Sequence, residues 1–172
     1  MITVFSASKT YAMTGWRLGY LAASAQLAEL IAKVQEPVVS CAAAVAQKAA
    51  EAALLGPQDC VIEMREAYRR RRDMTVAALR ETGLFVTEPR GAFYILADIG
   101  RATQATYAFS RWLVAEHGVA VAPGETFGPR AAGLVRLSLA ADAGSLEEGV
   151  ARLARAVEAW PADTIDSPLA TL

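Results

Sequence analysis

The first apolar residues of the chain form two short runs, at residues 2–5 and 17–23, with a polar stretch between them. Short apolar runs bounded by small polar residues are typical of buried sheet strands. The intervening residues 6–16 lack helical periodicity, and parallel strands are normally joined by a longer crossover that contains a helix. We therefore predict that the two strands are antiparallel neighbours, joined by a polar loop.

The middle of the chain has the pattern of helices. Ala-rich stretches at residues 26–34 and 40–55 are expected to be helical. They are expected to be separated at Pro37, because proline lacks the backbone donor that a helix interior needs. A long third helix is predicted from Pro57 to residue 82, with Gly83 as its C-terminal stop.

Beyond Gly83 the pattern changes to short segments that alternate between strand and helix. Strands are predicted at residues 85–87, 93–96, 119–122 and 134–140, and a helix at 104–117 that ends at Gly118. A last helix is predicted to start at Ser145, which forms a capping box with Glu148. Its core face consists of Leu146, Val150, Leu153 and Val157. Together these segments predict an α/β fold.

The loop between the first two strands carries the residues with the clearest chemistry. It contains SASKT at residues 6–10, followed by TGWRLGY at residues 14–20. Because the end of one antiparallel strand and the start of the next lie at the same sheet edge, Lys9 and Arg17 are expected to face one pocket. Taken alone, the S-x-S-K pattern is a weak signal, and an ordinary loop lysine would be the default interpretation.

These two segments resemble the cofactor-lysine segment of class I and II (fold type I) aminotransferases, which depend on pyridoxal 5'-phosphate (PLP). Three further segments are similar to signatures of the same family: PRGAFY at residues 89–94, APGETFG at 122–128 and VRLSLA at 135–140. The resemblance extends to about residue 160 and is to the carboxy-terminal portion of the family. It implies the end of the large PLP-binding domain at residues 1–60, the small α/β domain at 61–160 and a loose tail at 161–172.

The resemblance also implies roles for individual residues. Lys9 is expected to be the Schiff-base lysine and general base, and Ser6 and Arg17 to hold the cofactor phosphate. Ser8 is expected to assist them, although ordinary turn chemistry explains a serine there equally well. Arg136 is expected to bind the α-carboxylate of the substrate. Without the upstream lysine motif, a surface ion pair would be the default interpretation of Arg136.

By resemblance, the expected activity is transfer of an amino group between an amino acid and a 2-oxo acid, in an enzyme that is usually a homodimer. The family's acidic partner of the cofactor ring lies well before the lysine, whereas only residues 1–8 precede Lys9 here. A truncated chain is therefore expected. The alternatives are an inactive fragment, half of a split enzyme, a β-lyase, synthase or decarboxylase of the same fold, or the sensor domain of a transcription regulator.

The composition of the chain limits the classes of binding partner and the cellular compartment that we expect. The sequence contains 17 Lys and Arg residues against 18 Asp and Glu, so there is no electrostatic case for a nucleic acid or a membrane surface. Polar residues interrupt the longest apolar stretch, and the first residues lack a signal-peptide pattern. The two cysteines, Cys41 and Cys60, have no metal-binding spacing and are expected to be buried thiols. These features predict a cytoplasmic protein without a metal site.

Overall fold

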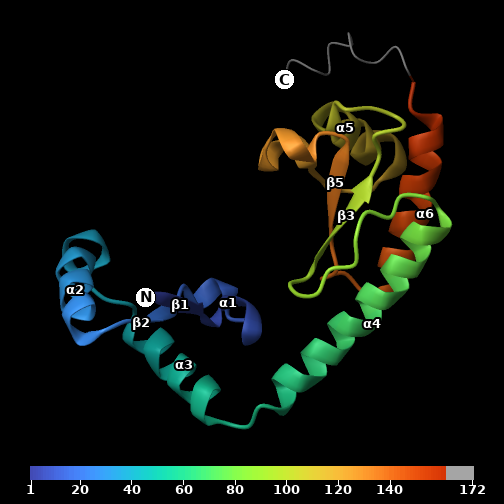
Figure 1. The fold of residues 1–172 in the computed structure, drawn as a ribbon. Helices are drawn as coiled ribbons and strands as arrows, with labels where there is room; N and C mark the ends of the chain where they lie inside the picture. Colours follow the sequence, from blue (N-terminus) through green and yellow to red (C-terminus); the bar gives the residue numbers. More distant parts are fainter. Residues whose placement is uncertain (162–172) are drawn as a thin grey trace. The chain divides into compact units, whose positions relative to one another are not determined.

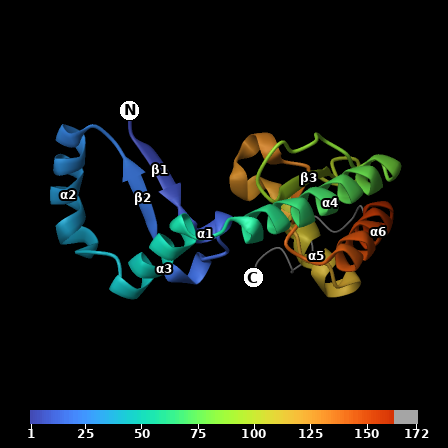
Figure 2. The ribbon, with the colours of Figure 1, turned by 90° about the horizontal axis from the view of Figure 1, so that it is seen from below.

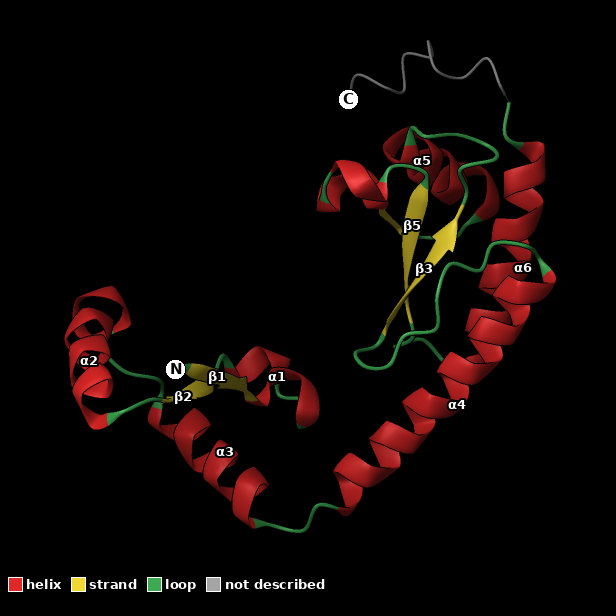
Figure 3. Cartoon of the chain, in the orientation of Figure 1, coloured by secondary structure: helices red, strands yellow, loops and turns green. Residues whose placement is uncertain are grey.

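The computed structural model describes residues 1–161, and the loose tail predicted at 161–172 lies outside the described residues except for Pro161. The chain divides into two compact units, Met1–Arg65 and Glu66–Leu172. Both contain helices and strands, which confirms the α/β class (Figures 1 and 3). None of the helices in residues 1–161 combines the length and the hydropathy of a membrane span.

The first unit contains a two-stranded sheet and helices. Its elements are β1 (Thr3–Ser6), α1 (Ala7–Thr10), the 3-10 turn η1 (Thr14–Trp16), β2 (Gly19–Ala22), α2 (Ala25–Val39) and α3 (Ala44–Leu55). Strands β1 and β2 run antiparallel, with Thr3 opposite Ala22 and Ser6 opposite Gly19 (Figure 2). The predicted antiparallel pairing is therefore confirmed. The segment between the strands is more ordered than predicted, because α1 and η1 each form a helical turn.

The prediction that Pro37 separates two helices was wrong. Helix α2 continues through Pro37 to Val39. The missing N–H of the proline removes one hydrogen bond, and the next turn is closed by Ser40, whose N–H donates to the Glu36 carbonyl at 2.9 Å. Ser40 has a positive φ of 55°, which is outside the right-handed helical region. This conformation ends α2 and explains why α3 begins at Ala44 rather than at residue 40.

The prediction that the first strand is buried was also wrong. Most residues of β1 and β2 are exposed, and Val4 is 76% exposed. The sheet in the described residues has two strands, so each keeps one unpaired edge. The buried residues that pack together in this unit are Ala7, Met13 and Ala50. Cys41 and Cys60 are exposed rather than buried thiols.

The second unit is built around a three-stranded antiparallel sheet in the order β3-β5-β4. Helix α4 (Asp59–Glu81) begins before the unit boundary and ends inside this unit, with Gly83 at a φ of 70° just beyond it. The remaining elements are β3 (Tyr94–Asp98), α5 (Thr106–His117), β4 (Ala122–Pro123), the 3-10 turns η2 (Gly124–Phe127) and η3 (Pro129–Ala131), β5 (Leu134–Ser138) and α6 (Ala143–Ala159).

Two predicted strands of this unit are shorter than expected. Residues 85–87 form only a single bridge, from Phe85 to Ala97, and residues 119–122 contribute only the start of β4. The predicted stop at Gly118 is confirmed, since this glycine caps α5 in the left-handed conformation. Helices α4, α5 and α6, strands β3 and β5 and the residues next to them bury one continuous core: Val76, Leu79, Leu84, Ile95, Ala97, Ile99, Phe109, Leu113, Val135, Leu137, Leu139, Leu146, Val150, Leu153, Ala156 and Val157.

Helix α6 starts earlier than predicted. Its N-cap is Asp142, whose carboxylate accepts hydrogen bonds from the Ser145 N–H at 3.0 Å and from the Ser145 hydroxyl at 2.6 Å. Ser145 is therefore the third residue of the helix and not its cap. The predicted core face of α6 is confirmed, because all four of its residues are buried.

Candidate active site

The reversal between β1 and β2 brings the two residues of the lysine motif into one short segment. The last strand pair is Ser6 with Gly19, so Lys9 and Arg17 both lie in the connection beyond it. Lys9 belongs to the turn of α1, and Arg17 caps η1. Both side chains are exposed.

Side-chain hydrogen bonds fix the shape of this reversal. The Thr14 hydroxyl donates to the Ser8 carbonyl at 3.0 Å, and Arg17 Nη1 donates to the Thr14 carbonyl at 2.8 Å. The Ala7 N–H donates to the Leu18 carbonyl at 3.2 Å. The backbone before Lys9 is therefore tied to the segment that carries Arg17.

Two backbone positions in the reversal have strict requirements. Arg17 has a φ of 51°, a left-handed conformation that costs an L-residue roughly 1–2 kcal/mol. At Gly19, a Cβ would lie 2.5 Å from the Phe5 carbonyl oxygen, so only glycine allows the strands to approach this closely. The local fold thus accommodates an arginine at a position that would suit glycine better.

The two serines of the motif differ in their surroundings. Ser6 is the N-cap of α1, and its hydroxyl oxygen accepts a hydrogen bond from the Ser8 N–H at 3.1 Å. A serine hydroxyl can donate as well as accept. The Ser6 hydroxyl can therefore serve the turn and still donate to a ligand oxygen. Ser8 is half-buried, and its carbonyl is held by Thr14.

A cavity of about 380 Å³ lies beside this reversal. Ser6 is among its lining residues, whereas Lys9 and Arg17 are not. The cavity is otherwise apolar in character, with contributions from both strands and from α3: Val4, Phe5, Ala7, Thr10, Tyr11, Leu18, Gly19, Tyr20, Ala50 and Leu54. The structure therefore brings Lys9 and Arg17 into one hydrogen-bonded segment but does not place them in this cavity.

Arg136 belongs to the second unit, where it lies at the centre of β5. Its neighbours across the sheet are Leu96 on β3 and Ala122 on β4. The guanidinium carbon lies 4.0 Å from the ring centre of Tyr94 and 4.6 Å from that of Phe127. Reasoning from the sequence missed both aromatic contacts. The register explains the first, since Tyr94 pairs with Ser138 and so shares a sheet face with Arg136.

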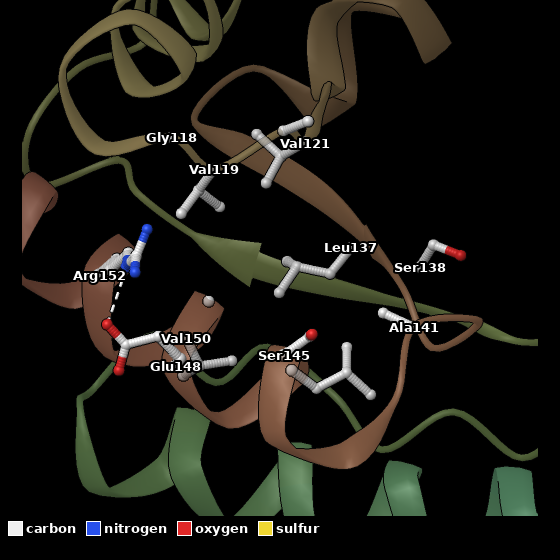
Figure 4. A pocket seen from close by; sticks show the side chains of 13 residues that line it. Gly118, Val119, Val121, Leu137, Ser138, Ala141, Ser145, Glu148, Val150 and Arg152 are labelled. Carbon is white, nitrogen blue, oxygen red and sulfur yellow. Dashed lines mark hydrogen bonds and ion pairs between the residues drawn. The ribbon is translucent and has the colours of Figure 1, made fainter.

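A second cavity of about 320 Å³ lies in the second unit, between the segment after α5 and helix α6 (Figure 4). The apolar residues that line this cavity include Val119, Leu137 and Val150. Arg152 at its rim is already engaged, because it donates to Glu148 at 2.8 Å and to the His117 carbonyl at 3.3 Å. Figure 4 shows the Arg152–Glu148 pair, which lies within α6. The hydrogen bond from Arg152 to the His117 carbonyl links α6 to the end of α5.

Two carboxyl groups of α6 have clear electrostatic surroundings. Hydrogen bonds from Ser145 lower the pKa of Asp142. The hydrogen bond and the positive charge of Arg152 lower the pKa of Glu148. Neither group is among the predicted site residues, and both act on the stability of α6. Within residues 1–161, no group of three or more His, Cys, Asp or Glu side chains is arranged to hold a metal ion.

Residues 1–153 match the family model described as aminotransferase class I and II. The chain is 41% identical to a probable N-acetyl-LL-diaminopimelate aminotransferase of Bacillus subtilis (strain 168), over 88% of this chain and 39% of that protein. It is 42% identical to an aspartate aminotransferase of Musicola paradisiaca (strain Ech703), over 92% of this chain and 39% of that protein.

Solved structures give the same result. An aromatic aminotransferase from Pyrococcus horikoshii OT3 matches with a TM-score of 0.84 and 40% identity, over 92% of this chain and 43% of that one. An aminotransferase from Mycobacterium tuberculosis matches with a TM-score of 0.85 and 33% identity, over 92% of this chain and 42% of that one. The chain thus spans well under half of the length of these relatives. It belongs to the class I and II aminotransferase family.

Proposed function

We propose that this chain forms the lysine-bearing and carboxylate-binding portion of a PLP-dependent aminotransferase. Residues 1–60 would be the end of the large PLP-binding domain and residues 61–160 the small α/β domain. The division into units at Arg65 and Glu66 supports this assignment. The relatives that match over most of the chain bear aminotransferase names, which supports the reaction class.

The observation that carries the proposal is the hydrogen-bonded reversal that holds Lys9 and Arg17 in one segment. A phosphate requires a fixed cation and hydroxyl donors, and Arg17, Ser6 and Ser8 provide groups of these types. The primary amine of Lys9 is the group that reacts with a carbonyl carbon. We therefore assign PLP attachment to Lys9 and phosphate binding to Ser6, Ser8 and Arg17.

Bound PLP supplies an electron-withdrawing ring that stabilises negative charge at the α-carbon of an amino acid. Residues of the chain itself would transfer the proton and bind the substrate. Lys9 would act as general base and carry a proton between the α-carbon of the amino acid and the C4′ carbon of the cofactor. Arg136 would bind the α-carboxylate through two parallel N–H···O bonds. The substrates are then an amino acid and a 2-oxo acid.

Assembly and location are part of the same proposal. The first unit exposes many large apolar side chains, among them Val4, Val34, Val38 and Leu55. Such side chains are typical of a surface that a partner covers, which supports a homodimer. The two cysteines are free thiols, which supports a reducing compartment such as the cytoplasm.

Reductive trapping tests the assignment of Lys9. The full chain is incubated with PLP, treated with borohydride and digested, and the modified lysine is identified by mass spectrometry. The expected result is a modified Lys9, with no modification in Lys9→Ala. Lys48, an exposed lysine that pairs with Glu51 at 2.7 Å, is the internal control. Equal modification of Lys9 and Lys48 would contradict the proposal.

The affinity for PLP tests the role of Arg17. Removing a charge-assisted hydrogen bond to a phosphate costs about 1.5–3 kcal/mol, so Arg17→Ala should weaken PLP binding by about ten- to a hundredfold. The measurement is a fluorescence or absorbance titration of the full chain. Arg130→Ala, which removes an exposed arginine of η3, serves as the control and should bind PLP like the wild type.

A further inference from the structure

The guanidinium carbon of Arg136 lies over two aromatic rings. Tyr94 lies at 4.0 Å and Phe127 at 4.6 Å, both measured from the guanidinium carbon to the ring centre. With the residues that the structure describes, the Arg136 side chain makes no hydrogen bond and no ion pair. The charge of the guanidinium is therefore held by the faces of the two rings, and neither contact is a hydrogen bond that occupies its N–H donors.

Other arginines of the same unit are held differently. Arg72 pairs with Asp73, Arg101 pairs with Glu158, and Arg152 pairs with Glu148. In each pair a carboxylate of the chain already occupies the guanidinium donors, so an incoming carboxylate would have to displace it. Arg136 is fixed by aromatic contacts instead, and these contacts leave the donors that a carboxylate needs.

The position of Phe127 is set by a lock at the start of α5. The Tyr107 N–H donates to the Glu125 carboxylate at 3.0 Å, and the Glu125 N–H donates to the hydroxyl of the buried Thr106 at 3.2 Å. These two bonds tie the loop of η2 to the helix. At Gly124, a Cβ would overlap the carbonyl oxygens of Ala131 and Leu134, so the backbone before Phe127 is closely packed.

Tyr94 is fixed by the sheet rather than by a loop. It is the first residue of β3, and its backbone pairs with Ser138 of β5. Its ring centre lies 4.2 Å from that of Phe93, which packs against the core of the unit. The two rings that cover Arg136 therefore come from separate elements, and each element is anchored independently.

We propose that Tyr94 and Phe127 are positioning residues that hold Arg136 ready to bind a carboxylate, with the Thr106–Glu125 lock keeping Phe127 in place. The inference rests on the proposed function, because the carboxylate would be that of the amino-acid substrate. Contact with an aromatic face strengthens the hold on a cation without using any of its donors. A side chain that is already held in place loses less conformational entropy when the carboxylate binds, so the entropic cost of binding is smaller.

Paired substitutions separate ring electrostatics from simple packing. Phe127→Leu keeps an apolar side chain but removes the aromatic face, whereas Phe127→Tyr keeps the face. Tyr94→Leu and Tyr94→Phe form the matched pair on β3. Acetate is the probe, and its binding to the full chain is followed by NMR through the Nε–Hε signal of Arg136, assigned by its loss in Arg136→Lys.

We expect the Leu variants to bind acetate about two- to thirtyfold more weakly than the wild type, and the Tyr and Phe variants to bind like the wild type. The heteronuclear relaxation of the Arg136 signal should show a more mobile side chain in the Leu variants only. Glu125→Ala should produce the same loss of order at Arg136, because it removes the acceptor of the Tyr107 N–H that holds the loop of Phe127.

Equal acetate affinity and equal Arg136 order in Phe127→Leu, Tyr94→Leu and the wild type would overturn the positioning role. Absence of any acetate response at Arg136 in the wild type would overturn the carboxylate receptor itself. Both outcomes are distinct from failure of the proposed PLP attachment, which is measured at Lys9 by reductive trapping and involves neither acetate nor Arg136.

Discussion

The two units of the chain fix their functional side chains by different means. In the first unit, the packed cluster of buried residues consists of Ala7, Met13 and Ala50, and hydrogen bonds through Thr14 hold the reversal around Lys9 and Arg17. In the second unit, a continuous core lies beneath the sheet that carries Arg136. The reactive segment therefore depends on local polar contacts, whereas the candidate carboxylate receptor rests on a packed scaffold.

Amide hydrogen exchange of the full chain is expected to show the largest difference between the units. An isolated pair of strands is marginally stable, whereas amides beneath a packed core open only at a substantial fraction of the global unfolding free energy. Amides of β5 should exchange at least about a thousandfold more slowly than those of β1. Exchange is measured by NMR or mass spectrometry, and similar protection of the two strands would contradict the expected difference in stability between the units.

Truncation of a large core side chain should give the next largest effect. Phe109 is fully buried and packs against Trp112 and Trp160. Phe109→Ala should lower the free energy of unfolding by about 3–5 kcal/mol, because it removes apolar burial and leaves a cavity. Val4→Ala in β1 should change it by less than about 0.5 kcal/mol. Urea denaturation followed by circular dichroism measures both values.

Glycine substitutions in the second unit should have an intermediate effect. Gly124→Ala forces its new methyl group into two carbonyl oxygens, so we expect a loss of about 1–3 kcal/mol. Gly149→Ala meets open space inside α6 and should stabilise the helix by about 1 kcal/mol. Urea denaturation measures both variants, and a destabilised Gly149→Ala would show that the space around α6 is not open.

The smallest effect concerns the pH dependence of α6. Hydrogen bonds from Ser145 lower the pKa of Asp142, so the folded state binds this proton more weakly than the unfolded state does. The contribution of Asp142 to the free energy of unfolding is present in full above pH 3.8, the ordinary pKa of this carboxyl group. It is lost as the pH falls through the lowered pKa of the folded state. In acid titrations of thermal stability, Asp142→Ala should reduce the slope in this range, and a slope equal to that of the wild type would contradict this role of Asp142.

The elements that could be predicted from the sequence are those determined by local patterns. Periodicity was sufficient for the buried face of α6, and Gly118 was sufficient to mark the end of α5, because left-handed backbone favours glycine. The short connection between β1 and β2 was sufficient to predict antiparallel pairing. Each of these features depends on residues close together in the chain.

The features that could not be predicted depend on competition or on distant partners. The capping-box pattern pointed to Ser145 as the start of α6, whereas the structure places the cap at Asp142, which is an equally good capping residue three positions earlier. Pro37 is tolerated because α2 ends soon after it. The rings around Arg136 required the register of β3 with β5 and the lock on η2, neither of which a local pattern contains.

The left-handed backbone at Arg17 means that the residue that is best for folding stability at this position differs from the residue that can bind an anion. Arg17→Gly would relieve roughly 1 kcal/mol of strain and at the same time remove the guanidinium. A library of this chain selected only for heat resistance should therefore drift toward glycine or asparagine at position 17. Retention of arginine there across natural variants would be a signature of continuing selection for a bound anion.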